Sequence, residues 1–427
     1  MQLHFENLRG WVSPANAFIA LYAEMENAFW IDREHATADR FSVIGTGTPI
    51  DVQSASDLDG FIENYDEVSL PFAFRPGLVG WLDFEQVAPK FLRVESAMVF
   101  DHDNRGIYLI AKTNDDTKFR HWLDAALLRI GLIGGETLKY LASVSESQFS
   151  DARPRHSDSE YLELIGQAQD HIAAGDVYQI CLTNQYEITA EADPLAVFLS
   201  LRETNPAPYA GFYRIDCVTL VCSSPEQFLK VDVNGLVTTK PIKGTRPRGL
   251  NPDLDELVIE ELSQNKKERA ENLMIVDLMR NDLSRVCEVD SVTVTSLFEV
   301  ETYATVHQLV STVQGQLSQN QSALDALQAA FPGGSMTGAP KLRAIEIIRE
   351  LERGERGVYS GVVGFLADNG SADFGMVIRS LVFEQNRITL GVGGGITIDS
   401  NPIEELAETK LKAKALLRAL KAPDILG

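Results

Sequence analysis

The order of the predicted strands and helices limits the folds that this chain can adopt. Apolar runs and two-residue alternation predict strands at residues 27–31, 41–45, 106–111, 177–190, 213–222, 361–367, 373–383 and 387–393, and two more strands within residues 228–239 around a hairpin turn at Asn234-Gly235. Helical periodicity predicts helices at residues 119–130, 161–174, 194–204, 253–283, 337–353 and 401–420. Because several strands follow one another between helices, the pattern argues against a simple alternating fold of strands and helices.

A polar segment divides the chain into two parts. Residues 143–159 are rich in serine and contain the triplet Arg153-Pro154-Arg155, a composition typical of a linker or a long surface loop. We therefore predict an N-terminal part at residues 1–142 and a C-terminal part at residues 160–427. The strand and helix patterns are denser in the C-terminal part, so the candidate functional residues are sought there.

The charge balance excludes several classes of partner. The 427 residues contain 38 Lys and Arg against 61 Asp and Glu, for a formal net charge of −23. Such a surface repels nucleic acid and anionic membranes. The sequence contains no run of 18 or more apolar residues and no pattern of a secretory signal at its start. We predict a cytoplasmic protein that binds neither nucleic acid nor membrane, and an anionic substrate then needs a local positive patch or a metal ion.

Two predicted helices each carry a pair of glutamates three residues apart. Glu268 and Glu271 share a face of one helix, and Glu405 and Glu408 share a face of the last helix. If the two faces meet, they present four carboxylates to one cation, and Mg²⁺ prefers carboxylate oxygens and often bridges to an anionic substrate. The spacing alone also fits two solvated helix faces, so both interpretations stay open at this point.

Three further features are typical of a site for an anionic ligand. The run Gly393-Gly394-Gly395 follows a predicted strand, and consecutive glycines let backbone N–H groups approach a ligand closely. Glu226 follows an apolar strand, where burial would raise its pKa and suit it to act as a general acid. Arg379 lies in an otherwise apolar strand and needs an anionic partner, either a structural carboxylate or a substrate. Each feature also has a structural interpretation, as a hairpin, a turn residue or an ion pair.

Taken together, these stretches resemble one family. The segments that carry the resemblance lie at residues 175–179, 224–226, 241–246, 271–282, 331–341, 357–361, 393–395 and 408–410. In this order they resemble the chorismate-utilising enzymes, which include anthranilate synthase large subunits, aminodeoxychorismate synthase component I, isochorismate synthases and salicylate synthases. The strong match covers about residues 160–420, and the N-terminal third matches weakly. The resemblance implies an α+β fold of the anthranilate synthase component I type, with two large, orthogonally packed antiparallel sheets flanked by helices in α/β/β/α layers.

The resemblance also implies roles for individual residues. Glu271 and Glu408 match the family's Mg²⁺ ligands, with Glu268 and Glu405 as close or water-mediated support. Glu226 matches the general acid that protonates the departing C4 hydroxyl of chorismate. The residues that match positions of the substrate pocket are Gln179, Thr245, His307, Tyr359, Arg379, Gly393, Gly394, Gly395 and Lys412.

Residues 241–245 distinguish two branches of the family. Anthranilate synthases read Pro-Ile-Ala-Gly-Thr at the matching place, whereas aminodeoxychorismate synthases carry a lysine, as this chain does at Lys243. The resemblance implies that this amine attacks C2 of chorismate to give a covalent intermediate. The alternative is that Lys243 only pairs with Glu226 or with a substrate carboxylate. Gln179 replaces the lysine with which isochorismate and salicylate synthases activate water, so ammonia is the expected nucleophile.

The resemblance therefore implies the function of an aminodeoxychorismate synthase component I. Such an enzyme makes 4-amino-4-deoxychorismate, a precursor of p-aminobenzoate and folate. We find no glutaminase-type cysteine in a glycine-flanked turn, so we expect a separate glutamine amidotransferase subunit to supply ammonia and another enzyme to make p-aminobenzoate. One alternative is anthranilate synthase component I or another chorismate-aminating enzyme of secondary metabolism. An alternative of a different class is a non-catalytic chorismate-binding scaffold subunit.

Overall fold

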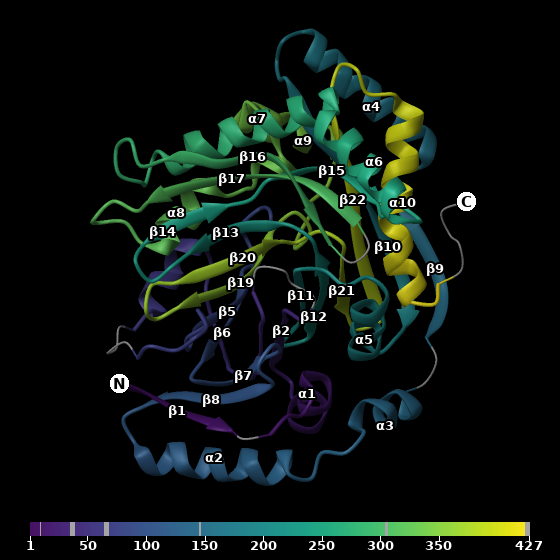
Figure 1. The fold of residues 1–427 in the computed structure, drawn as a ribbon. Helices are drawn as coiled ribbons and strands as arrows, with labels where there is room; N and C mark the ends of the chain where they lie inside the picture. Colours follow the sequence, from purple (N-terminus) through teal and green to yellow (C-terminus); the bar gives the residue numbers. More distant parts are fainter. Residues whose placement is uncertain (9, 35–38, 64–67, 145–146, 304–305, 423–427) are drawn as a thin grey trace.

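Two large antiparallel sheets form the centre of the molecule (Figure 1). The computed structural model describes the whole chain except residues 9, 35–38, 64–67, 145–146, 304–305 and 423–427. Within the described residues, the first sheet has twelve strands. Eleven of them lie in the order β1 (Gln2–Leu8), β8 (Gly106–Thr113), β7 (Ser96–Asp101), β3 (Phe41–Gly45), β2 (Ala28–Asp32), β11 (Tyr209–Ile215), β12 (Val218–Ser224), β21 (Ser380–Glu384), β22 (Arg387–Ile396), β10 (Gln179–Glu191) and β18 (Gly338–Ala339). The twelfth strand, β9 (Gln148–Pro154), pairs with β10. The second sheet has ten described strands, with β16 (Thr293–Thr302) paired to β17 and the others in the order β15 (Ile242–Pro247), β17 (Val306–Gln316), β14 (Leu236–Thr239), β13 (Gln227–Val231), β20 (Ala372–Met376), β19 (Val362–Ala367), β5 (Gly77–Leu82), β6 (Lys90–Val94) and β4 (Thr48–Ile50).

Helices cover the outer faces of both sheets. The helices that pack on or beside the first sheet are α1 (Pro14–Tyr22), α2 (Asp116–Ile130), α3 (Glu136–Ser143), α4 (Asp158–Ala173), α5 (Pro194–Thr204), α9 (Lys341–Glu352) and α10 (Pro402–Ala419). The helices on the second sheet are α6 (Pro252–Gln264), α7 (Lys266–Leu283) and α8 (Ala323–Ala330). Among the described residues, no helix is long and apolar enough to cross a membrane. The layers confirm the predicted α+β class.

Apolar side chains from both sheets fill the space between them. Phe29 and Leu220 of the first sheet belong to the same buried cluster as Trp81 and Phe365 of the second sheet, and all four are at most 5% exposed. In Figure 1, β13, β19 and β20 of the second sheet run across β10 and β21 of the first sheet. Because alternate residues of a strand point to opposite faces, the neighbour of Phe29, Trp30, packs instead among the helices on the outer face.

The N-terminal and C-terminal parts of the chain contribute strands to both sheets. β2 pairs with β11, where Trp30 lies opposite Phe212, and β5 pairs with β19, where Trp81 lies opposite Val363. The prediction of a linker or surface loop at residues 143–159 is wrong for β9, which pairs with the long strand β10. The strand is mostly half-buried or exposed, so its polar composition is typical of an edge strand as well as of a loop.

Three predicted elements are each divided in two. The predicted strand at 213–222 is part of β11 and β12, with Asp216 between them at φ 54°. The predicted strand at 373–383 becomes β20 and β21, with Arg379 between them at φ 51°. The predicted helix at 253–283 is interrupted at Asn265, whose side chain accepts a hydrogen bond from the backbone of Glu268 and caps α7.

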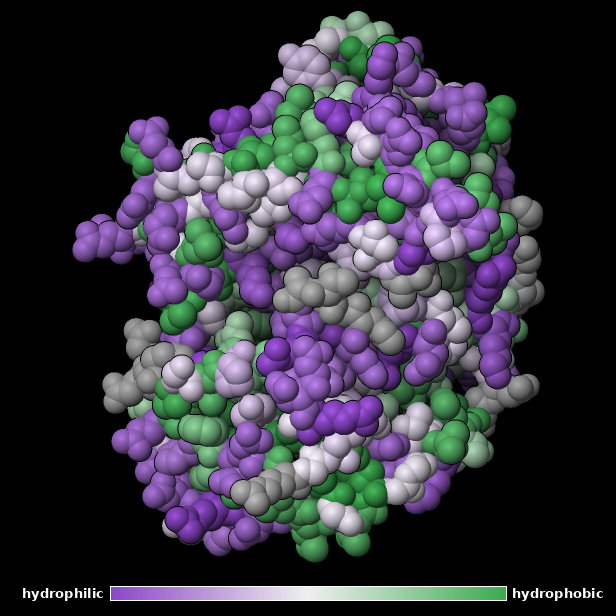
Figure 2. Space-filling model, viewed as in Figure 1, coloured by the Kyte–Doolittle hydropathy of each residue, from purple (hydrophilic) through white to green (hydrophobic). Residues whose placement is uncertain are grey.

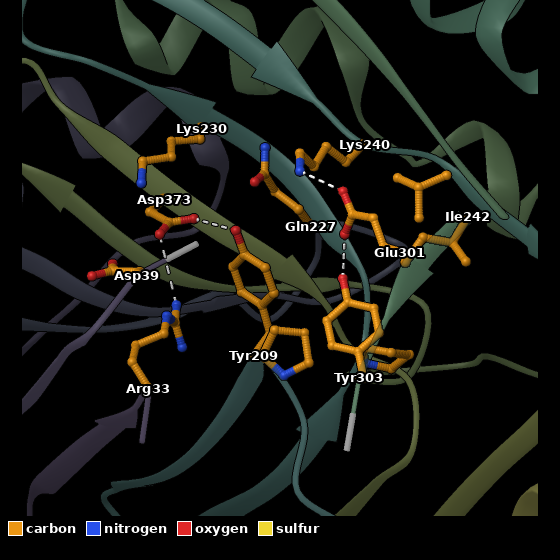
Figure 3. Close-up of a pocket in the computed structure, with 13 residues that line it drawn as sticks. Arg33, Asp39, Tyr209, Gln227, Lys230, Lys240, Ile242, Glu301, Tyr303 and Asp373 are labelled. Carbon is orange, nitrogen blue, oxygen red and sulfur yellow. Dashed lines mark hydrogen bonds and ion pairs between the residues drawn. The ribbon is translucent and has the colours of Figure 1, made fainter. Parts of the chain in front are cut away.

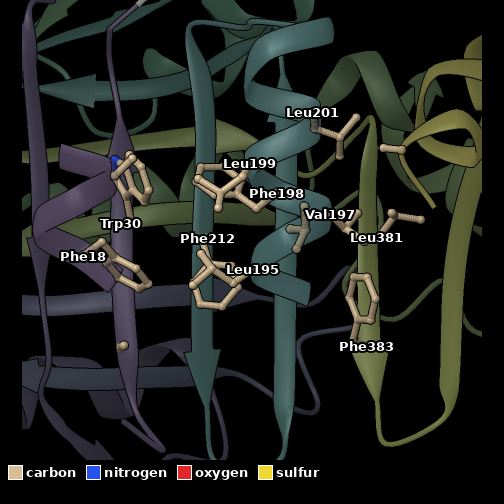
Figure 4. Packing of buried hydrophobic residues seen from close by; sticks show 14 of the residues in the cluster. Phe18, Trp30, Leu195, Val197, Phe198, Leu199, Leu201, Phe212, Leu381 and Phe383 are labelled. Carbon is tan, nitrogen blue, oxygen red and sulfur yellow. The ribbon is translucent and has the colours of Figure 1, made fainter. Parts of the chain in front are cut away.

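An aromatic cluster joins α5 to the first sheet (Figure 4). The ring of Phe198 on α5 lies 5.1 Å from Trp30 and 6.0 Å from Phe212, measured between ring centroids. All three side chains are at most 1% exposed. These contacts hold the helix on the face that lies opposite the inter-sheet core.

We predict that Phe198→Ala lowers the free energy of unfolding by about 3–5 kcal/mol, because it removes a buried ring and leaves a cavity. Urea unfolding followed by tryptophan fluorescence measures this loss. Leu128→Ala is the control, because Leu128 on α2 is 69% exposed and its truncation is expected to cost less than about 0.5 kcal/mol. Equal losses for the two variants would contradict the packing described above.

Candidate functional site

The candidate site lies where the glycine-rich end of β22 meets β15 and α7. β22 belongs to the first sheet and runs beside β10, whereas β15 belongs to the second sheet. A Cβ atom added to Gly395 of β22 would lie 3.3 Å from Lys243 Nζ of β15 and 2.5 Å from Gln179 Nε2 of β10. Glycine at this position therefore leaves the room that both side chains occupy. The two sheets thus bring three of the predicted site residues into contact.

Glu271 on α7 lies between two lysine side chains. Its Oε2 atom is 4.0 Å from Lys243 Nζ, and its Oε1 atom is 3.9 Å from Lys267 Nζ. Lys267 Nζ also lies 3.4 Å from Glu405 Oε1, so one ammonium group contacts a carboxylate from each of the two glutamate pairs. Burial raises the pKa of Glu271, and the carboxylates of Glu268 and Glu405 add to this rise against the opposing charges of the lysines.

The other two predicted metal ligands contact basic side chains of their own. Glu268 Oε1 lies 3.4 Å from Arg246 Nη1, and Glu408 Oε1 lies 2.8 Å from Lys412 Nζ. Partial burial works to raise the pKa of Glu408, but the contact with Lys412 outweighs it and the pKa is lowered. In the part of the chain that the structure describes, no three His, Cys, Asp or Glu side chains converge closely enough to hold a metal ion. The glutamate pairs are thus brought to one region with basic side chains between their carboxylates.

Glu226 is a buried acid between β12 and β13. Its exposed fraction is 7%. Burial raises its pKa to about 7, and a hydrogen bond with Ser335 and the positive charge of Lys243 limit this rise. The direction agrees with the prediction made from the apolar strand that precedes it. A carboxyl group with this pKa is suited to donate a proton near neutral pH.

Arg379 and Tyr359 are two further predicted pocket residues, and Tyr359 packs on β22. Arg379 is half-buried. Its guanidinium has no hydrogen bond or ion pair among the described residues. Burial lowers the pKa of Arg379, and nearby Tyr359 and Glu408 oppose this change. Tyr359 is buried, and its ring packs directly against the backbone of Gly391. Half-buried guanidinium groups favour a planar anion such as a carboxylate. The arrangement leaves Arg379 free to bind one.

The remaining predicted pocket residues differ in how their polar groups are used. Gln179 is 1% exposed, and its Oε1 atom has no hydrogen-bond partner among the described residues. Thr245 is exposed and accepts a hydrogen bond of 3.4 Å from a glutamine side chain of β17. The ring of His307 is buried, with Nε2 2.8 Å from Asp255 Oδ1 and Nδ1 2.9 Å from Thr302 Oγ1. Gln179 thus has an unused acceptor atom, whereas both ring nitrogens of His307 are engaged.

A separate pocket lies beside β15, which carries Lys243, and beside the β12–β13 connection, which carries Glu226 (Figure 3). Three sequence neighbours of these residues line it, namely Pro225, Gln227 and Ile242. Several of its polar groups pair with one another, as where Tyr209 donates a hydrogen bond of 2.9 Å to Asp373. In the described part of the chain, neither Glu226 nor Lys243 belongs to its lining, so it is distinct from the candidate site.

Two residues of the site were not predicted from the sequence. Lys267 lies four residues before Glu271, a spacing that pairs opposite charges on a helix, so the signal was present. Ser335 lies in the glycine-rich turn at residues 331–341. No periodicity predicts that this turn brings its hydroxyl group to Glu226.

Comparison with known proteins gives a family match over most of the chain. A family model described as chorismate binding enzyme matches residues 39–418. An aminodeoxychorismate synthase of Streptomyces griseus is 43% identical over 381 residues, which cover 86% of this chain and 52% of the relative. An aminodeoxychorismate synthase of Streptomyces pristinaespiralis is 37% identical over 454 residues, covering 95% of this chain and 63% of the relative. The chain thus spans between about half and two thirds of the length of these relatives.

Similarity extends to other enzymes with the same fold. Anthranilate synthase component 1 of Streptomyces coelicolor is 33% identical over 453 residues, covering 98% of this chain and 88% of the relative. The crystal structure of anthranilate synthase component I from Streptococcus pneumoniae has a TM-score of 0.79 and 29% identity, and the match covers 95% of this chain and 97% of that one. These comparisons confirm the predicted fold.

We predict that Glu226→Gln stabilises the protein at neutral pH but not in acid. The folded-state pKa of about 7 lies above the ordinary value of 4.5. The wild type therefore loses stability as the pH rises from about 4.5 to about 7, because its carboxyl group is protonated in the folded chain and ionised in the unfolded chain. The amide does not titrate, so its advantage should grow over this range to on the order of 3 kcal/mol.

Urea unfolding of both proteins at a series of pH values, without Mg²⁺ or substrate, measures this difference. A difference in unfolding free energy that does not change with pH would contradict the raised pKa of Glu226.

Proposed function

Because the chain belongs to the family of chorismate-binding enzymes, we propose that it binds chorismate between its two sheets and aminates it at C4. The product is 4-amino-4-deoxychorismate, a precursor of p-aminobenzoate and folate. The observation that carries this proposal is the position of Lys243, 4.0 Å from Glu271 and beside Gly395, with the charge of its amine acting on Glu226. The aminodeoxychorismate synthases among its relatives support the same activity.

Lys243 and Glu226 divide the chemistry between them. The neutral amine of Lys243 attacks C2 of the chorismate ring while Glu226 donates a proton to the C4 hydroxyl group, which leaves as water. The ring double bonds shift as C2 gains the lysine nitrogen and C4 loses oxygen. Ammonia then adds at C4 and expels the lysine amine from C2, so the ring double bonds return to their positions. The sum is chorismate and ammonia going to 4-amino-4-deoxychorismate and water.

Two groups of residues hold the substrate carboxylates in this proposal. Arg379 and Tyr359, with backbone N–H groups of Gly394 and Gly395, bind the pyruvyl carboxylate. This use is supported by the guanidinium of Arg379, which has no ion pair within the described residues. Thr245, His307, Gly393 and Lys412 complete the pocket. Asp255 already forms a hydrogen bond with His307, so in this proposal His307 shapes the pocket through its packing.

In this proposal Glu271 and Glu408 would hold Mg²⁺, with Glu268 and Glu405 in support. The donor atoms suit such an ion chemically, because carboxylate oxygens are the preferred ligands of Mg²⁺, and Glu271 and Glu405 both lie within 4 Å of one cation, the ammonium group of Lys267. When bound, Mg²⁺ supplies positive charge to the ring carboxylate of chorismate.

Gln179 supports ammonia rather than water as the second nucleophile. An amide is no base at neutral pH and cannot deprotonate water. Its buried Oε1 atom, which lacks a partner in the described structure, is an acceptor for an N–H group of ammonia. We propose that a glutamine amidotransferase partner supplies the ammonia and that the reaction takes place in the cytoplasm.

One alternative activity has specific support. The match to this chain covers 88% of the anthranilate synthase component 1 of Streptomyces coelicolor and 97% of the solved anthranilate synthase structure. An anthranilate synthase would direct ammonia to C2, the carbon that Lys243 is proposed to attack. The product therefore separates the two activities.

We predict that the pure protein converts chorismate to 4-amino-4-deoxychorismate when Mg²⁺ and an ammonium salt are supplied at mildly alkaline pH. Mass spectrometry and NMR of the products measure the outcome. Anthranilate with pyruvate would show that the pocket directs ammonia to C2. No turnover, even with a cognate glutaminase, would favour a non-catalytic scaffold subunit.

We predict that Lys243 carries a covalent adduct when ammonia is withheld. Intact-protein mass spectrometry should show a mass increase equal to chorismate less one water, and peptide mapping should place it on Lys243. Lys243→Ala is expected to lack the adduct, whereas Lys240→Ala, whose amine pairs with Glu301 in the separate pocket, should retain it. A wild type that makes the product without any adduct would overturn the assignment of Lys243 as the nucleophile.

A further inference from the structure

One ammonium group links the two helices that carry the glutamate pairs. Lys267 Nζ on α7 lies 3.9 Å from Glu271 Oε1 of the same helix and 3.4 Å from Glu405 Oε1 of α10. Ser400 donates a hydrogen bond of 2.7 Å to the same Oε1 atom of Glu405. The lysine therefore joins α7 to α10 at the point where the two carboxylates meet.

The carboxylates need a cation wherever they lie close together. Glu271 and Glu405 are 8% and 7% exposed, so water screens their mutual repulsion only in part. The charge of Glu268 adds to this repulsion. An ammonium group between two carboxylates offsets it. Lys267 supplies that charge in the protein without a metal ion.

Lys267 is also the lysine of the site that is best able to leave. Its side chain is 51% exposed, against 13% for Lys243 and 25% for Lys412. Lys412 is held further by a hydrogen bond of 2.8 Å to the carbonyl oxygen of Gly393. A half-exposed ion pair is weak, and its flexible stem can turn into solvent.

We propose that Lys267 is an internal counter-ion, which holds Glu271 and Glu405 together in the metal-free protein and is displaced when a divalent cation binds these carboxylates. The inference rests on the proposed function, which assigns these glutamates to Mg²⁺. Mg²⁺ binds carboxylate oxygens in near-octahedral geometry, and its charge repels an ammonium group that lies between the same two carboxylates. The lysine and the metal ion therefore compete for the same atoms.

The test is the affinity of the whole protein for Mg²⁺ alone, measured by isothermal titration calorimetry without chorismate. Lys267→Met removes the competitor, and Lys266→Met removes the same charge from an exposed neighbour. Lys267→Met is expected to bind Mg²⁺ about two- to fivefold more tightly than Lys266→Met, given the range for exposed ion pairs. Lys267→Arg is expected to bind it more weakly than the wild type, because a guanidinium can bridge two carboxylates with more hydrogen bonds.

A second measurement separates competition from a general effect of charge. In EDTA, Lys267→Met should unfold at a lower temperature than Lys266→Met, because Glu271 and Glu405 then lack their counter-ion, and saturating Mg²⁺ should remove this difference. Equal affinities and equal melting temperatures for the two variants would overturn the inference while leaving the metal site in place. A wild type that binds no Mg²⁺ would overturn it together with the proposed metal site, and the product assay then decides the proposed amination separately.

Discussion

The candidate site depends on the contact between Lys243 and Gly395. Lys243 extends from β15 of the second sheet toward β22 of the first sheet, and the missing side chain at position 395 leaves room for the lysine amine. A side chain there would crowd both this amine and the amide group of Gln179, and Glu271 on α7 lies 4.0 Å from the amine. The acid, the proposed nucleophile and the proposed cation ligands therefore keep their relative positions because two sheets and one helix meet at a glycine.

Charge compensation explains how an acidic protein could present a site for the proposed dianionic substrate. The chain has a formal net charge of −23, yet Lys243, Lys267 and Lys412 lie among the glutamates of the site. These basic side chains lie within ion-pair distance of carboxylates, so positive and negative charges alternate within the site. A carboxylate or a divalent cation that binds there would compete with these ion pairs.

Much of the fold was predictable from the sequence, because long amphipathic helices repeat their apolar positions with one regular period. α4 and α10 lie where the periodicity placed them, and the raised pKa of Glu226 follows from the apolar strand before it. Periodicity could not show chain reversals inside apolar stretches, such as the turn at Arg379. Nor could it show which partner a side chain chooses across the fold, as when Asp255 engages His307. The site assignments themselves stay predictions.

A crystal structure of the Lys243→Met variant with Mg²⁺ and chorismate tests the account most directly, because this variant should bind the substrate without attacking it. The account predicts chorismate between the sheets, with C2 facing residue 243, the C4 hydroxyl group facing Glu226, and the ring carboxylate on a metal ion held by Glu271 and Glu408. Chorismate in the separate pocket of Figure 3, or a C4 hydroxyl group that faces away from Glu226, would contradict it.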